Sequence, residues 1–250
     1  MEIQFPLFVA NWKMHKTVAE TKEHLKRLLP LVFRQKAGVW IAVPYTDIAA
    51  ASQLVKNSKI LIGAQNMSDL AAGAFTGEVS APMLLEAGAS FVVLGHSERR
   101  KFFFEENALI NRKIKLALRS NIHVILCIGE SKEEKEANKT ALVLEQQMKE
   151  CLKDVPFEMA PKVLIAYEPI WAIGTSHPAP IEIVEEIHTL CKNYLANYWG
   201  IAPNLCPILY GGSVNVTNAG SFLKSHVVDG LLVGAASLDV LSFTEIIHQA

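Results

Sequence analysis

The sequence lacks an excess of charge of either sign. Its 250 residues carry 24 lysines and arginines against 25 aspartates and glutamates, and its pI is about 6.7. Because nucleic-acid-binding domains present a basic face, this balance predicts no nucleic-acid partner. It also lacks an uninterrupted apolar stretch of about 18 residues, so no membrane span is expected. The segment from Met1 to Phe5 has no basic stretch leading into an apolar run, so no secretory signal is expected either.

Cysteine is scarce and carries no recognisable pattern. The four cysteines are Cys127, Cys151, Cys191 and Cys206, and their spacings match neither a zinc site nor a CxxC redox pair. The sequence therefore predicts no metal site. Reduced thiols of this kind are typical of a cytoplasmic protein.

Short apolar runs recur along the chain, rich in Val, Ile and Leu and too short for helices. The eight runs are Phe5 to Ala10, Val39 to Val43, Ile60 to Ala64, Phe91 to Leu94, Val124 to Ile128, Val163 to Tyr167, Ile208 to Tyr210 and Gly230 to Val233. Continuous runs of this kind favour strands that are buried on both faces, as in a parallel sheet.

Helix signals fill the segments between these runs. Thr17 and Glu20 form a capping box, Asp47 is placed to cap a helix from Ile48 to Val55, and Gly200 can end a helix from Ile181 to Tyr198. Eight strand–helix units in 250 residues predict an α/β fold with a single (β/α)8 barrel, residues 1–250 forming one domain. The alternative, an open doubly wound sheet, is disfavoured because no GxGxxG follows the first strand.

In such a barrel the chemistry lies at the carboxyl ends of the strands. Asn11 and Lys13 follow the first run, His96 the fourth and Glu168 the sixth. Pro169 biases Glu168 towards an extended conformation that projects over the rim. If the residues after His96 open a helical turn, their N–H groups disfavour imidazolium and keep the ring neutral. Each residue alone has a structural alternative: an ion pair, a buried histidine, a solvated lysine or a turn amide.

Glycine turns follow the last two strands. Gly211 and Gly212 come after the seventh run and Gly234 after the eighth. Backbone N–H groups in such turns can approach an anion closely, and this is the usual phosphate site of barrel enzymes. The alternative is that these glycines only make tight turns.

Taken together, these residues resemble the triosephosphate isomerase family across nearly the whole chain. The matching strings are Ala10-Asn11-Trp12-Lys13-Met14, Gly73-Ala74-Phe75-Thr76-Gly77-Glu78-Val79-Ser80, Gly95-His96-Ser97-Glu98-Arg99-Arg100, Cys127-Ile128-Gly129-Glu130, Ala166-Tyr167-Glu168-Pro169-Ile170-Trp171-Ala172-Ile173-Gly174-Thr175 and Tyr210-Gly211-Gly212-Ser213-Val214. The length of the string around Glu168 makes the resemblance highly specific.

The resemblance implies a TIM barrel that interconverts D-glyceraldehyde 3-phosphate and dihydroxyacetone phosphate in glycolysis and gluconeogenesis. It implies Glu168 as the base, neutral His96 as the electrophile, Lys13 as the group that stabilises the enediolate, and Asn11 as a substrate-orienting amide. The implied reaction needs no metal and no organic cofactor. The implied phosphate ligands are backbone groups of Gly174, Ser213, Gly234 and Ala235, and the implied supporting residues are Ser97, Glu98 and Cys127.

The resemblance also implies a lid and a homodimer. The lid comprises Pro169, Ile170, Trp171, Ala172, Ile173, Gly174, Thr175, Ser176, His177, Pro178 and Ala179. The dimer loop comprises Phe75, Thr76, Gly77 and Glu78, which would insert into the partner subunit. The stretch from Ser176 to Ala179, the residue Ala235 and the loop tip from Met67 to Ala72 differ from the usual family pattern.

Two other functions remain to be weighed. A non-catalytic sugar-phosphate binder would need the glycine turns but would have no use for Glu168, His96 and Lys13 together. Another phosphate-binding barrel enzyme would lack the lid string before Gly174.

Overall fold

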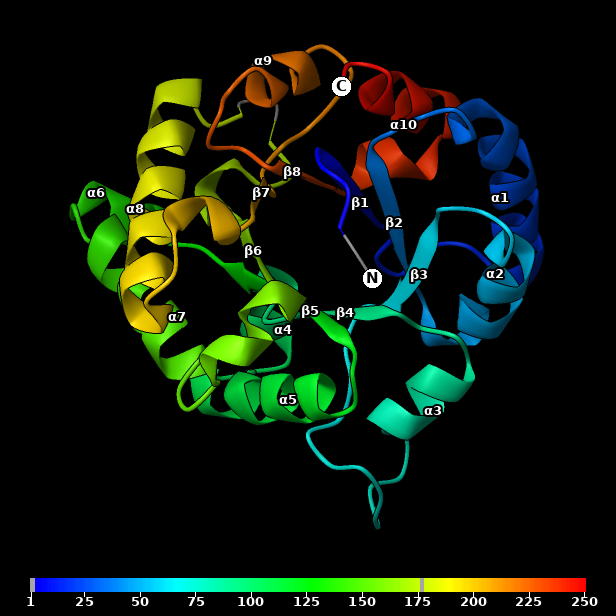
Figure 1. Cartoon of the computed structure of the whole chain (residues 1–250), viewed down its shortest axis with the longest axis horizontal. Helices are drawn as coiled ribbons and strands as arrows, with labels where there is room; N and C mark the ends of the chain where they lie inside the picture. The colour runs from blue at the N-terminus through cyan, green and yellow to red at the C-terminus, as the bar shows by residue number, and fades with distance from the viewer. Residues whose placement is uncertain (1–2, 176–177) are drawn as a thin grey trace.

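The strands form a closed parallel barrel. The computed structural model describes residues 3–175 and 178–250, and within them the strand order is β1 to β8, with β1 paired to β8 (Figure 1). The strands are β1 (Leu7–Asn11), β2 (Gly38–Val43), β3 (Leu61–Ala64), β4 (Phe91–Leu94), β5 (His123–Ile128), β6 (Val163–Tyr167), β7 (Ile208–Tyr210) and β8 (Gly230–Val233). Each predicted run matches one strand to within two residues at either end, so the predicted (β/α)8 fold is confirmed.

Helices follow the strands and surround the barrel as a ring (Figure 1). The α-helices are α1 (Val18–Val32), α2 (Ile48–Val55), α3 (Ala81–Glu86), α4 (Ser97–Phe102), α5 (Asn107–Arg119), α6 (Lys132–Glu136), α7 (Thr140–Cys151), α8 (Ile181–Trp199), α9 (Ala219–Leu223) and α10 (Val240–Ile247). The short 3-10 helices are η1 (Tyr45–Asp47), η2 (Phe157–Lys162), η3 (Ile170–Ala172), η4 (Pro203–Leu205) and η5 (Ala235–Leu238).

Alternation along each strand produces two apolar layers. In β1, Leu7 and Val9 join the cluster inside the barrel, whereas Phe8 and Ala10 join the larger cluster between strands and helices. This double burial explains why the strand sequences are continuously apolar rather than alternating.

Two of the three predicted helix-capping features are confirmed. The Thr17 hydroxyl accepts from the Glu20 N–H and the Glu20 carboxylate accepts from the Thr17 N–H, which completes the capping box. Gly200 ends α8 in the left-handed conformation at φ 66°. The prediction for Asp47 is wrong: η1 runs directly into α2, and the Asp47 carboxylate accepts from the Thr21 hydroxyl at 2.7 Å instead of capping.

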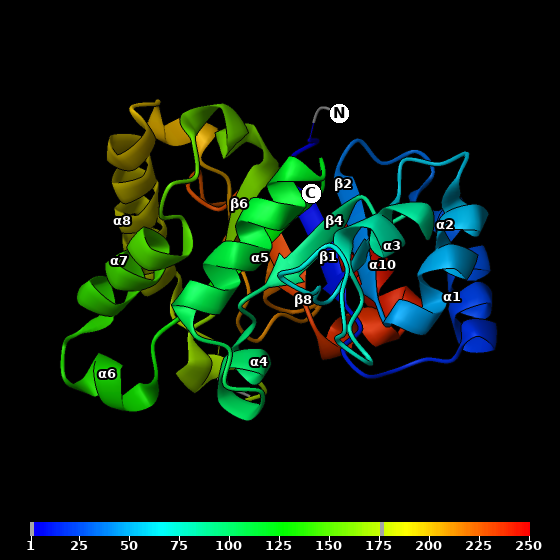
Figure 2. The ribbon, with the colours of Figure 1, turned by 90° about the horizontal axis from the view of Figure 1, so that it is seen from below.

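The two ends of the barrel have different roles. The strands run parallel, so their carboxyl ends all meet at one rim, and the loops leading to the short helices α4 and α6 leave from it. Figure 2 shows both helices at the lower edge of the molecule. No helix among the described residues is long and apolar enough to cross a membrane.

Candidate active site

A small pocket opens at the carboxyl ends of the strands. Its volume is about 120 Å³. Its lining includes every described residue that the sequence predicts to be catalytic or to bind substrate: Asn11, Lys13, His96, Glu168, Gly174, Ser213, Gly234 and Ala235. The fold thus brings together residues that lie more than 220 positions apart in the chain.

Glu168 enters this pocket from the end of β6 on a backbone that cannot shift freely. Its N–H donates to the Ile128 carbonyl at 2.7 Å, and its own carbonyl packs so tightly against Gly129 that a Cβ there would lie 1.8 Å from the oxygen. The carboxylate is 2 % exposed. One oxygen accepts from the Ser97 N–H at 3.1 Å, and the other lies 3.1 Å from His96 Nε2.

The His96 ring is held in place by the start of α4. It occupies the position before the helix, and its Nδ1 accepts from the Glu98 N–H at 3.3 Å. Nε2 is the ring nitrogen that faces the Glu168 carboxylate. The helical turn expected after His96 is present as α4, and the neutral ring stays a prediction.

Lys13 is held by both its backbone and its side chain. Its φ of 53° is left-handed, and its N–H donates to the Asn11 amide oxygen at 3.0 Å. Its ammonium group lies 2.6 Å from the Glu98 carboxylate. The Gln65 amide donates to the Lys13 carbonyl at 2.8 Å and to the Ala42 carbonyl at 3.1 Å. Lys13 therefore presents one cation to the pocket in a restrained loop.

The glycine turns after β7 and β8 form one wall of the pocket. A Cβ on Gly212 would lie 2.2 Å from the Tyr210 hydroxyl oxygen, so only glycine fits there. Gly234 precedes η5, and the Ser237 N–H and hydroxyl both donate to the Gly234 carbonyl, at 2.9 and 2.7 Å. These bonds make the turn after β8 a compact unit beside the pocket.

The described parts of the predicted lid are held by contacts on both sides of residues 176–177. At one end the Trp171 indole donates to the Glu130 carboxylate at 2.7 Å, and the Lys135 ammonium lies 3.1 Å from the centre of the indole ring. At the other end the Ala179 N–H donates to the Tyr210 hydroxyl at 3.1 Å. Two predicted lid residues, Ser176 and His177, lie outside the described residues.

The lid also contacts the glycine wall directly. The Ser213 hydroxyl donates to the Thr175 carbonyl at 2.8 Å, and Ile173 and Gly174 line the pocket. Gly174 has φ 67°, a conformation that glycine adopts without strain. The lid residues next to the pocket are therefore positioned against the turn that follows β7.

Two buried acids lie behind these groups. Burial raises the pKa of the Cys127 thiol well above its usual value, and the charge of the neighbouring Glu168 raises it further. Burial also raises the pKa of Glu130, although its bonds from the Trp171 indole and the Tyr167 hydroxyl oppose the shift. Cys127 thus remains a neutral neighbour of the Glu168 carboxylate, and Glu130 is an anchor for the lid.

The predicted dimer loop is not part of this pocket. Residues 70–78 are exposed between β3 and α3, and Figure 1 shows this loop projecting away from the barrel. Phe75 is 50 % exposed. The Arg112 guanidinium binds Asp69 at 2.7 Å and so restrains the base of the loop.

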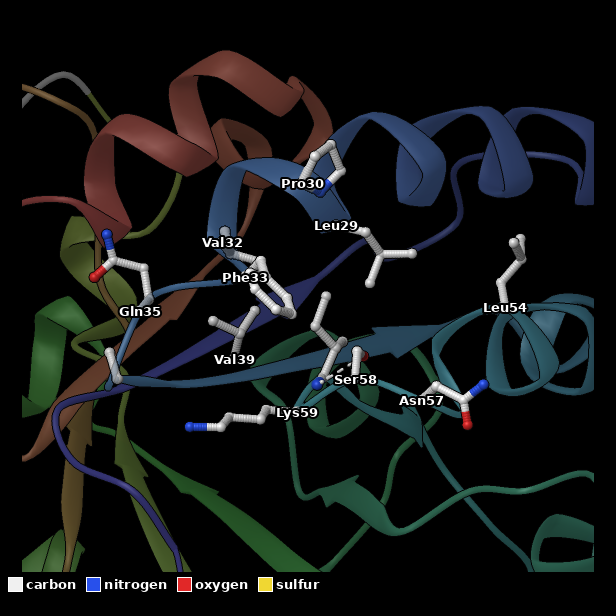
Figure 3. A pocket seen from close by; sticks show the side chains of 12 residues that line it. Leu29, Pro30, Val32, Phe33, Gln35, Val39, Leu54, Asn57, Ser58 and Lys59 are labelled. Atoms are coloured by element: carbon white, nitrogen blue, oxygen red, sulfur yellow. Dashed lines mark hydrogen bonds between the residues drawn. The ribbon is translucent and has the colours of Figure 1, made fainter.

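A larger cavity of about 600 Å³ lies at the opposite end of the barrel. Figure 3 shows Leu29, Phe33 and Val39 pointing into it. Val39 and Ile60, at the amino ends of β2 and β3, form part of its lining. Among the described residues, its lining contains no carboxylate and no imidazole.

Some residues around the site could not be identified from the sequence, because they act through contacts between distant parts of the chain. Gln65 follows β3 and looks like an ordinary loop amide, yet it braces Lys13. Tyr210 and Lys135 anchor the lid. A polar residue at a strand end was the only available signal for Gln65, and nothing marks Lys135 among the charged residues of α6.

The fold and the pocket define a barrel enzyme with a carboxylate–imidazole pair, one cation and glycine turns suited to an anion. A sequence model of the triosephosphate isomerase family matches residues 6–250. The triosephosphate isomerase of Protochlamydia amoebophila is 46 % identical over 97 % of this chain and 92 % of the relative, and that of Aquifex aeolicus is 45 % identical over 97 % and 98 %. The crystal structure of triosephosphate isomerase from Bartonella henselae superposes with a TM-score of 0.89 at 34 % identity, covering 98 % of this chain and 99 % of that one. The chain belongs to the triosephosphate isomerase family and is an isomerase.

Proposed function

We propose that this chain interconverts D-glyceraldehyde 3-phosphate and dihydroxyacetone phosphate by proton transfer through an enediolate. The observation that carries the proposal is the contact of the Glu168 carboxylate with His96 Nε2 at 3.1 Å, inside a pocket that Lys13 and glycine turns complete. The family relationship supports the choice of substrate. Its place in metabolism would be glycolysis and gluconeogenesis.

Glu168 is the proposed base. It removes the proton from the carbon beside the substrate carbonyl and returns it to the carbonyl carbon, so one carboxylate serves both half-reactions. The side chain must turn from the Ser97 N–H to reach carbon. The fixed backbone at Gly129 and Ile128 limits this motion to the side chain itself.

His96 and Lys13 manage the charge that develops on oxygen. Neutral His96 donates from Nε2 to the substrate oxygens and moves protons between them. The Lys13 ammonium stabilises the negative enediolate, and the Asn11 amide orients the substrate. Glu98 restrains Lys13 through its 2.6 Å ion pair. No step in this scheme requires a metal or an organic cofactor.

The phosphate is proposed to bind between the lid and the glycine turns. Backbone groups of Gly174, Ser213, Gly234 and Ala235 line the same side of the pocket. Holding the phosphate there keeps its C–O bond near the enediolate plane. Elimination of phosphate requires that bond to overlap the π system, so a closed lid favours protonation at carbon instead.

We further propose a homodimeric, cytoplasmic enzyme in which residues 1–250 form one catalytic domain. Apolar side chains are exposed in the segments that follow β1, β3 and β4: Met14 is 95 % exposed, Phe75 50 %, Phe102 61 % and Phe103 62 %. An apolar surface of this kind favours contact with a second subunit. The four cysteines are buried and unpaired, which suits a reducing compartment.

A coupled assay in D₂O tests the proposed reaction. We expect NADH consumption with glyceraldehyde 3-phosphate and a coupling dehydrogenase that reduces dihydroxyacetone phosphate, and we expect deuterium in the product at the carbon that Glu168 protonates. Hydride transfer would leave the product without deuterium and would contradict the enediolate. Binding of substrate without turnover would instead identify a sugar-phosphate binder. Glu158→Asp, on an exposed surface, serves as the matched control for preparation.

A further inference from the structure

We propose that Lys16 is a positioning residue for the substrate phosphate, acting through the turn after β8. The proposal rests on the function proposed above, because it assumes that this turn binds phosphate. Lys16 lies in the loop between β1 and α1, three residues after Lys13. Strands β1 and β8 are paired, and the Lys16 side chain reaches from the loop after β1 to the segment after β8.

The contact that carries the proposal is a hydrogen bond to the far end of η5. The Lys16 ammonium donates to the Leu238 carbonyl at 3.0 Å. Leu238 is the last residue of η5, and Ala235, which lines the pocket, is the first. A cation at the carboxyl end of a helical turn stabilises the carbonyl groups that gather there.

The turn transmits this contact because it is internally braced. Ser237 donates twice to the Gly234 carbonyl, from its N–H and from its hydroxyl. A compact unit held at Leu238 cannot tilt without moving Gly234 and Ala235. Fixing the last carbonyl therefore fixes the direction of the N–H groups at the pocket.

The surroundings of the ammonium restrict it to this position. The ammonium lies 5.1 Å from the centre of the buried Trp12 ring. The charged groups near it include the Glu20 and Asp239 carboxylates. His24, from α1, also approaches the Leu238 backbone, but burial lowers the pKa of His24 to about 4. At neutral pH, Lys16 is thus the cation at Leu238.

The backbone of Lys16 supplies an independent observation. Its φ is 77°, in the left-handed region, where a side chain with a Cβ is strained and glycine is not. Asn121 also has a left-handed backbone, at φ 62°, but asparagine is a residue type that tolerates this region better than lysine does. Lys16 therefore makes its contact with Leu238 from a backbone conformation that glycine would adopt with less strain.

This strain provides a sharp test, the variant Lys16→Gly. The substitution relieves the backbone and removes the ammonium group. Asn121→Gly, at a left-handed position at the amino end of β5, is the matched control, and Lys16→Arg should restore the contact. Three quantities are measured for each variant: the inhibition constant of inorganic phosphate, kcat/KM with glyceraldehyde 3-phosphate, and kcat/KM with D-glyceraldehyde, which has no phosphate.

For Lys16→Gly we expect phosphate to inhibit about tenfold more weakly and kcat/KM with the phosphorylated substrate to fall by a similar factor. Activity with D-glyceraldehyde should change less than about twofold, because the turn acts only on phosphate. Lys16→Arg should remain within about threefold of the unaltered enzyme. The control should match the unaltered enzyme in all three measurements.

Two results would overturn the inference. Unchanged phosphate inhibition in Lys16→Gly would show that the turn does not depend on the ammonium, and equal losses with both substrates would show a merely structural role. Lys16→Met, which keeps the strained backbone but loses the charge, decides the question if the glycine variant does not fold. An unaltered enzyme with no activity on glyceraldehyde 3-phosphate would refute the proposed function itself. Activity with normal phosphate inhibition in Lys16→Gly and Lys16→Met would refute only the role of Lys16.

Discussion

Shortening the proposed base by one methylene, Glu168→Asp, should reduce turnover on the order of a hundredfold. The carboxylate now lies 3.1 Å from both the Ser97 N–H and His96 Nε2. Removing one methylene draws it back by roughly 1 Å, which takes it beyond hydrogen-bond distance of both donors. Misplacement of a reacting group by about 1 Å costs on the order of a hundredfold in rate.

The backbone cannot recover the lost distance. A Cβ built on Gly129 would lie 1.8 Å from the Glu168 carbonyl oxygen, so the two chains are already in close contact there. The bond from the Glu168 N–H to the Ile128 carbonyl is only 2.7 Å long. A hundredfold loss corresponds to about 2.7 kcal/mol of transition-state stabilisation, and it should appear in kcat, because ground-state binding depends on Lys13 and the phosphate site.

The assay measures kcat, KM and the inhibition constant of inorganic phosphate for Glu168→Asp, Glu168→Gln and the surface control Glu158→Asp. We expect KM and phosphate inhibition within about threefold of the unaltered enzyme, and a further loss of kcat in Glu168→Gln, which has no base. A kcat for Glu168→Asp within about fivefold of the unaltered enzyme would refute Glu168 as the base. A loss that appears only in KM would assign the residue to binding.

Three further outcomes are expected. Tyr210→Phe removes the hydroxyl that anchors the Ala179 N–H and should increase methylglyoxal released per isomerisation severalfold; an unchanged ratio would separate this bond from lid closure. Burial lowers the pKa of His24 to about 4, so the unfolded chain binds a proton that the folded chain excludes as pH falls from 6.5 to 4. The contribution of His24 to the free energy of unfolding should therefore be fully present above pH 6.5 and be lost as the pH falls to 4, a decline on the order of 2 kcal/mol. Urea titrations of His24→Gln should show a shallower decline of the free energy of unfolding than those of the unaltered protein. Sedimentation at micromolar concentration should give about twice the chain mass of 27.6 kDa, and Phe75→Glu should shift it towards the monomer; a fully active monomer of the unaltered chain would contradict the dimer.

The barrel could be predicted because its determinants are local. Parallel strands buried on both faces leave continuous apolar runs, and each run between helix signals became one strand. The positions of His96 and Glu168 followed from the rule that strand ends meet at one rim. The helical turn expected after His96 could also be predicted, because its signal lies in the residues that directly follow the strand.

Contacts between distant side chains could not be predicted in this way. The partners of Gln65 and Lys135 depend on which rotamers the packed loops allow, and no spacing in the sequence encodes them. Asp47 shows the same limit: it stands at the right position to cap α2, yet Thr21, 26 residues away, offers its hydroxyl to the carboxylate. Local propensity identifies candidates for such a carboxylate, and tertiary packing selects among them.

The hydrogen bonds of Glu168 connect the geometry of the site to its proposed chemistry. The carboxylate accepts from the Ser97 N–H and lies against Nε2 of His96, the donor that the mechanism assigns to the substrate oxygens. A bound substrate oxygen and the Glu168 carboxylate therefore compete for one N–H. When the substrate takes the donor, Glu168 loses a hydrogen bond that stabilises its charge, and a buried carboxylate with fewer donors is a stronger base. Substrate binding would thus release the base and activate it in one event, which is why His96 needs to be neutral: an imidazolium would hold Glu168 as an ion pair, and the substrate could not displace it.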